Sequence, residues 1–97
     1  MNLMTFREDA LLAVESVFAF SDFTRRAESL CDELEGDADL IQRYKKAWFE
    51  MEIVNGVALG EWEDDGRPLI WMEKWNAKYK EDALEVIHDL LLVVSGR

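Results

Sequence analysis

The chain has 97 residues, 49% of them hydrophobic, and its 21 acidic side chains against 11 Lys and Arg give a net charge of −10. One continuous apolar rhythm over this length predicts one domain, residues 1–97, because two halves would bury too little surface to fold alone. The acidic surplus argues against direct nucleic-acid binding, which depends on Lys and Arg. It favours a basic protein partner, although solubility alone also explains such a charge.

The composition also bears on where the protein works. No run of about 18 apolar residues is present, so no membrane span is predicted. The N-terminal segment lacks an apolar core followed by a small-residue cleavage site, and we expect no signal peptide. The single cysteine, Cys31, cannot form an internal disulfide, which fits a reducing compartment. We therefore expect a cytoplasmic protein.

The first predicted helix begins near Thr5, because Thr5 and Glu8 form a capping-box pattern. Its apolar seam consists of Leu11, Val14 and Phe18. Ser21-Asp22 then interrupts the rhythm, and both residue types favour turns and caps. The sequence therefore predicts a helix boundary at Ser21-Asp22.

The second predicted helix has charges that oppose its dipole. Its apolar positions are Phe23, Ala27, Leu30 and Leu34, and Gly36 can end it in the left-handed conformation. Arg25 and Arg26 lie early and acids lie late, which costs up to about 1 kcal/mol at each end. Such a broken local rule often marks a functional region. We therefore predict one exposed acidic patch that contacts a partner, formed by Asp32, Glu33, Glu35, Asp37 and Asp39.

A long third helix, Leu40–Leu59, is predicted to be the centre of the fold, with Asp37 or Asp39 as its N-cap. One face is formed by Leu40, Tyr44, Ala47, Met51, Val54 and Ala58. The apolar stripe is widened by Trp48, Phe49, Ile53, Val57 and Leu59, so we expect neighbours on several sides. Gly56 and Gly60 favour a continuous or kinked helix that another helix can approach closely. A helix that ends at Asn55-Gly56 is the alternative.

The next segment is the most acidic turn of the chain, where Trp62 lies among four carboxylates, Glu61, Glu63, Asp64 and Asp65. We predict that these five residues contact a partner, with Trp62 as the anchor and the charges steering encounter. In the alternative, Trp62 folds back over the end of the bundle. The resemblance of this turn to a calcium loop fails, because the position that needs a bidentate Glu is Met72.

Two further helices are predicted after this turn. Pro68 favours the first position of a helix, whose seam is Leu69, Met72, Trp75 and Tyr79, with Trp75 in the core. The alternative is a hairpin that pairs Leu59–Trp62 with Leu69–Met72. The last helix opens at Glu81 or Asp82, and its seam is Leu84, Ile87, Leu91 and Val94. The fold predicted from these elements is an all-α bundle of four or five helices.

The sequence lacks the patterns of catalytic and metal sites. One cysteine and one histidine, Cys31 and His88, cannot build a zinc or iron site. No phosphate-binding loop or nucleophile elbow is present, and no carboxylate pair stands out as an acid and base. We expect no enzyme, no metal and no cofactor.

Several of these features together resemble a known family. They are the segment Phe20–Arg26 in a short acidic helical chain, the aromatic pair Trp48-Phe49, and the acidic segment before the C-terminal helices. Over roughly half of its length the chain is similar to helical immunity proteins of the colicin D type. Their relatives protect bacteria from tRNA-cleaving toxins, including those of contact-dependent inhibition. The resemblance implies an acidic face that fills the basic RNA-binding cleft of a nuclease toxin. A small helical adaptor that assembles through an apolar face is the alternative, and the oligomeric state stays open.

Overall fold

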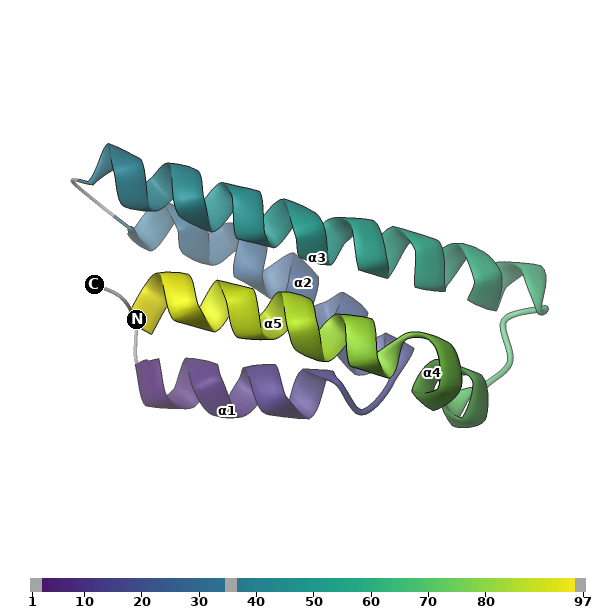
Figure 1. Ribbon diagram of the computed structural model, residues 1–97. Coiled ribbons are helices and arrows are strands. Elements are labelled where there is room, and N and C mark those ends of the chain that lie inside the picture. The colour runs from purple at the N-terminus through teal and green to yellow at the C-terminus, as the bar shows by residue number, and fades with distance from the viewer. Residues whose placement is uncertain (1–2, 35–36, 96–97) are drawn as a thin grey trace.

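The computed structural model describes residues 3–34 and 37–95, whose helices form one antiparallel bundle (Figure 1). Helices α1 (Leu3–Ala13), α2 (Val17–Leu30), α3 (Ala38–Asp64) and α5 (Lys80–Ser95) run alternately up and down. The short α4 (Met72–Lys78) lies at one end, and a 3₁₀ turn, η1 (Cys31–Glu33), follows α2. Helix α1 contacts α2 and α5, and α3 contacts the same two helices. The described residues contain no strand, so the predicted all-α bundle is confirmed.

Capping side chains decide where α2 and α3 begin. The Ser16 Oγ accepts a hydrogen bond from the Ala19 amide at 3.1 Å, and Asp37 accepts one from the Leu40 amide at 3.1 Å. The Asp37 cap is therefore confirmed. The boundary predicted at Ser21-Asp22 is wrong, because Ser16 caps α2 one turn earlier and Asp22 lies inside the helix. Helix α1 begins at Leu3, ahead of the cap predicted at Thr5.

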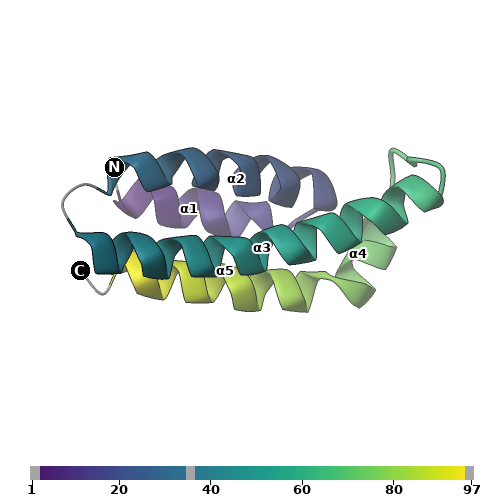
Figure 2. The same cartoon turned by 90° about the horizontal axis from the view of Figure 1, so that it is seen from above.

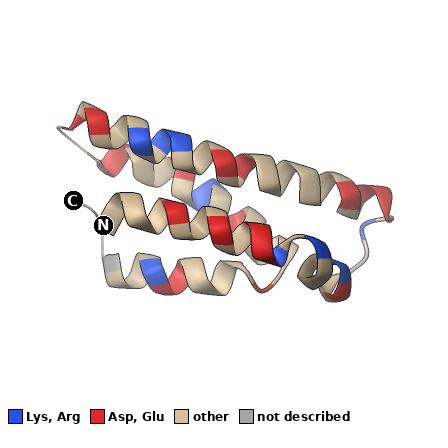
Figure 3. Ribbon diagram, viewed as in Figure 1, with Lys and Arg blue, Asp and Glu red and all other residues tan. Residues whose placement is uncertain are grey.

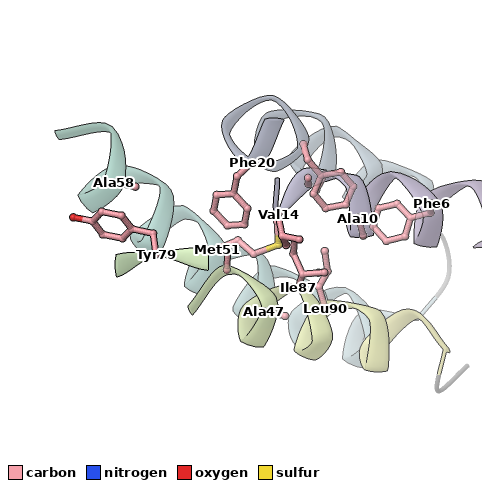
Figure 4. Close-up of a cluster of buried hydrophobic side chains, with 14 of the residues drawn as sticks. Phe6, Ala10, Val14, Phe20, Ala47, Met51, Ala58, Tyr79, Ile87 and Leu90 are labelled. Atoms are coloured by element: carbon pink, nitrogen blue, oxygen red, sulfur yellow. The ribbon is translucent and has the colours of Figure 1, made fainter. Parts of the chain in front are cut away.

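The core lies between the four long helices, where Phe20, Met51 and Leu90 are fully buried (Figure 4). The seam predicted for the first helix is wrong in two positions, since Leu11 and Phe18 are exposed and Phe18 belongs to α2. Their places in the core are taken by Phe6, Ala10 and Ala13. In α5 the buried residues are Ala83, Ile87, Leu90 and Val94, so Ile87 and Val94 are confirmed while Leu84 lies at the surface.

Trp75 of α4 ties the short helix to the core. Its ring is fully buried and lies 5.7 Å from the ring of Phe20 and 6.1 Å from that of Tyr79, centroid to centroid. Its indole N–H donates a hydrogen bond to the Val14 carbonyl at 2.8 Å. The predicted core position of Trp75 is therefore confirmed, and this one side chain connects α4 with the turn after α1.

Helix α3 is the longest element and continues past the turn between α1 and α2 (Figure 2). It passes through Gly56 and Gly60 without a break, as the preferred prediction stated. The expected cover on several sides is wrong, because Phe49, Ile53 and Val57 are 58%, 49% and 58% exposed. They point away from the row that packs on α2 and α5. A Cβ at either glycine would have no neighbour within 4 Å, so no other helix approaches there.

The connection from α3 to α4 is a loop and not a hairpin or the start of a helix. Helix α3 continues to Asp64, Gly66 and Arg67 adopt positive φ angles of 93° and 57°, and α4 begins only at Met72. The Trp62 indole N–H donates to the Pro68 carbonyl at 2.8 Å, and the Arg67 amide donates to the Trp62 carbonyl at 3.0 Å. These two bonds hold Pro68 in the turn, so the helix predicted from Pro68 and the alternative hairpin are both wrong.

The start of α1 and the end of α5 lie at the end of the bundle opposite this loop (Figure 1). A hydrogen bond of 3.2 Å from the Arg7 guanidinium to the Ser95 hydroxyl joins the two helices there. Among the helices described, none is both long enough and apolar enough to cross a bilayer.

Candidate protein-interaction site

The predicted turn after Leu59 is wrong, because Glu61, Trp62, Glu63 and Asp64 form the last turn of α3 and Asp65 is its C-cap. Two carboxylates of this acidic turn face α4 and two face solvent. The inner pair is Glu61 and Asp65. Glu61 accepts hydrogen bonds from the Lys78 ammonium at 2.6 and 3.0 Å and from the Tyr79 hydroxyl at 2.7 Å. The Lys74 ammonium lies 2.7 Å from Asp65 and 3.3 Å from Glu61. Because both lysines belong to α4, this network fastens the end of α3 to that helix.

The network changes the proton affinity of its members. Hydrogen bonds from Lys78 and then from Tyr79 lower the pKa of Glu61 from its ordinary 4.5 to about 2. Lys74, and after it the indole of Trp71, lower the pKa of Asp65. Burial, followed by the bond to Glu61, raises the pKa of Tyr79 from 10.0 to about 12. The inner carboxylates are therefore ionised and compensated at neutral pH.

The Glu61→Gln variant tests this network through the pH dependence of stability. Since the folded-state pKa of Glu61 lies below its ordinary value, its contribution is complete above about pH 4.5 and is lost as the pH falls toward about 2. We expect Glu61→Gln to melt below the wild type at pH 7 and at the same temperature near pH 2. Glu81→Gln, on the exposed face of α5, is the matched control. An equal deficit at both pH values would contradict the ionic role of Glu61.

The outer part of the turn comprises Glu63 and Asp64, which are exposed. Glu63 lies 3.5 Å from the Arg67 guanidinium, and Asp64 makes no ion pair with a described residue. Trp62 is half-buried: besides its bond to Pro68, its ring meets that of Phe18 edge to face, with centroids 5.3 Å apart. Trp62 thus has the contacts of a residue folded over the bundle end. Partner contact by this segment stays a prediction, and Glu63 and Asp64 are the carboxylates available for it.

The second predicted acidic patch lies at the opposite end of the bundle, around η1 and the start of α3 (Figure 3). Asp32, Glu33, Asp37 and Asp39 are all exposed there, and Glu35 lies outside the described residues. Two of the acids have structural roles, since Asp37 caps α3 and Asp39 lies 3.2 Å from the Arg43 guanidinium. The structure thus brings the described acids of the patch to one end, and Asp32 is the one without a described polar partner.

The loop between α3 and α4 displays two apolar side chains that the sequence prediction had placed in a helix. We call Leu69 and Ile70 the apolar loop; their exposed fractions are 92% and 88%, and Met72, the first residue of α4, is 54% exposed. The signal that separates them was present in the sequence. Trp71, Trp75, Tyr79 and Ala83 recur every four residues and are buried, and neither Leu69 nor Ile70 belongs to that row.

More than half of the basic side chains form ion pairs with acidic side chains of the same molecule. Ion pairs are formed by Arg25, Arg26, Arg43, Arg67, Lys74 and Lys78. By contrast, four exposed acids of α5 have no ion pair with any described residue, namely Glu81, Asp82, Glu85 and Asp89 (Figure 3). The surface therefore carries uncompensated negative charge on several sides.

No protein-family model, curated protein or solved structure matches this chain.

Proposed function

We propose that this protein is an acidic inhibitor, most concretely an immunity protein that binds a basic nuclease toxin and covers its nucleic-acid cleft. The observation that carries the proposal is the apolar loop, because Leu69 and Ile70 are almost fully exposed on a loop that is held in place. Adjacent aliphatic side chains in solvent are unfavourable unless a partner covers them. Their restraint lowers the conformational entropy lost on binding.

The charge distribution supports a basic partner. Glu63 and Asp64 are exposed in the last turn of α3, shortly before the apolar loop, and further exposed acids that form no ion pair with a described residue lie on α5. Exposed acids near an apolar contact speed encounter with a cationic surface and disfavour a second copy of this chain. A nuclease that binds the phosphate backbone presents such a cationic surface.

The experiment first identifies the product of the gene beside the one that encodes this chain and then measures tRNA cleavage by that product. We expect an equimolar amount of this protein to stop the cleavage. The association rate should fall as salt is raised from low to physiological ionic strength, since charge steering is screened within about 10 Å at 0.1 M. Stable binding without any change in cleavage would contradict the inhibitor assignment, and a neighbour without nuclease activity would remove its premise.

A helical adaptor is the second candidate, and the exposed row Phe49, Ile53 and Val57 on α3 favours it. Such a protein would assemble through apolar contact, and its association would hardly respond to salt. The Phe49→Ser/Ile53→Ser double variant separates the two functions. It should abolish assembly in the adaptor and leave nuclease inhibition intact in the inhibitor.

Reversing charge in the patch around η1 tests its part in binding. Asp32 and Glu33 follow the C-terminal end of α2, where the helix dipole disfavours acids. We expect Asp32→Lys/Glu33→Lys to leave the melting temperature unchanged or slightly raised, and to slow toxin association. Asp37→Lys serves as a contrast, because it also removes the cap of α3 and should cost about 1 kcal/mol of stability. If the double variant associated at the wild-type rate, the patch would not take part in binding.

A further inference from the structure

A groove of about 490 Å³ runs along the outside of the bundle between α2 and α3. Its apolar lining is formed by Phe18, Trp48 and Leu59 and its acidic lining by Asp22, Glu28 and Glu52, while Arg25 adds one basic side chain. Trp48 is fixed there, since its indole N–H donates to the Thr24 carbonyl at 2.8 Å. A second hollow of about 440 Å³ also has Glu28 and Trp48 in its lining and adds Asp32. The lining of the second hollow also contains Lys45, so acidic side chains outnumber basic ones in both hollows.

Asn55 lies in this groove and lacks the partners that a buried carboxamide needs. Its side chain is 8% exposed, and its Oδ1 is buried without a hydrogen bond. Buried polar atoms in folded proteins nearly always have a partner. Asn55 occupies a turn of α3 where the other buried residues, Met51 and Ala58, are apolar. An amide held there at a cost to stability indicates a ligand that completes its hydrogen bonds.

The charges around Asn55 specify a cationic ligand. Of the acids, Asp22 already binds Arg25 at 2.7 Å and Arg26 at 2.9 Å. Glu28 and Glu52 are exposed and form no ion pair with a described residue. The groove therefore has two uncompensated carboxylates beside the unpartnered amide. A cation placed between them would gain an ion pair and a hydrogen bond together.

We propose that this groove binds the guanidinium group of an arginine, which rests on the proposed function in that a basic partner supplies the side chain. A planar guanidinium stacks on the Trp48 ring and still directs donors to Glu52 and to Asn55. Lysine offers one compact ammonium and no plane to stack, so arginine is the better fit.

The test uses the whole protein and N-acetyl-arginine amide as the probe, followed by NMR. We expect saturable shifts of the Trp48 indole N–H and the Asn55 side-chain N–H₂ signals. The citrulline analogue, which has the same shape without the charge, should give none, and the lysine analogue should bind several-fold more weakly. Equal binding of lysine and arginine, or of citrulline and arginine, would overturn the guanidinium assignment. An arginine titration without saturable shifts at these two groups would overturn the site.

Two variants and one control complete the test. Asn55→Leu removes the unpartnered amide, so we expect it to raise the melting temperature while the arginine response of Trp48 is lost. Glu52→Gln should weaken arginine binding several-fold at unchanged stability, whereas the matched change Glu85→Gln on α5 should not. Wild-type binding in Asn55→Leu would overturn the role of Asn55. Because the probe requires no toxin, arginine binding without nuclease inhibition would refute the proposed function alone.

Discussion

A protein carrying Trp75→Ala is expected to lose about 3–5 kcal/mol of its free energy of unfolding, the usual cost of deleting a buried indole. The ring is fully buried against Phe20 and Tyr79, so its removal leaves a cavity where α4 meets the core. The Val14 carbonyl also loses its indole donor. Domains of this size are commonly stable by only about 5–15 kcal/mol. Urea denaturation at 25 °C should therefore show a variant that is close to unfolding.

The Trp75→Phe variant separates packing from hydrogen bonding. It keeps an aromatic ring in the site and removes the donor to Val14, so we expect a loss of about 1–3 kcal/mol. Trp62→Phe is the surface counterpart, because Trp62 is half-buried and its loss of the bond to Pro68 affects only the loop. A Trp75→Ala protein as stable as Trp62→Phe would show that α4 is not fastened through this residue.

The Leu69→Ser/Ile70→Ser variant should weaken binding of the proposed basic partner by about 2 kcal/mol or more, roughly 30-fold in Kd, as expected for hot-spot residues. Its melting temperature should not change, since the two side chains are 92% and 88% exposed. The loop itself is held by Trp62 and Pro68, which the variant leaves in place. Calorimetric titration and a thermal melt on the same sample measure both quantities.

An exposed leucine elsewhere provides the control for this variant. Leu92 of α5 is 57% exposed, and Leu92→Ser removes a similar aliphatic side chain from another face. We expect this variant to bind like the wild type. Equal weakening by Leu92→Ser would mean that general surface hydrophobicity, and not the apolar loop, drives association. Wild-type affinity in the double variant would exclude the loop from the contact.

The sequence predicted correctly those features of the fold that depend on residues close together in the chain. Asp37 caps α3, and the row from Leu40 to Ala58 faces the core, because capping and helical periodicity act within a few residues. The start of α2 was missed because Ser16 and Ser21 are both good caps. Pro68 was placed in a helix because its local preference was followed, whereas a bond from Trp62, six residues away, keeps it in a turn.

The candidate site was harder to predict than the fold, for a related reason. Glu61 and Glu63 have similar neighbours in the sequence. Only the position of α4 lets Glu61 accept a hydrogen bond from Lys78, while Glu63 remains exposed to solvent. The burial of Asn55 likewise depends on how α2 lies against α3. The exposure of Phe49 and Ile53 followed from their place opposite the core row, so a stricter use of helical periodicity would have predicted it.

The meeting of α1 and α5 at one end of the bundle, joined through Arg7 and Ser95, has a practical consequence for anyone who attaches this protein to something else. A fluorophore, a sensor chip or a carrier domain attached near the start of α1 or the end of α5 lies at the opposite end of the bundle from the apolar loop, and the fold is 44 Å long along its main axis. Orientation is then the same for both attachments, with Leu69 and Ile70 pointing into the analyte solution. A short peptide that joins the start of α1 to the end of α5 would likewise give a circular permutant, with new termini in another turn and the apolar loop unchanged.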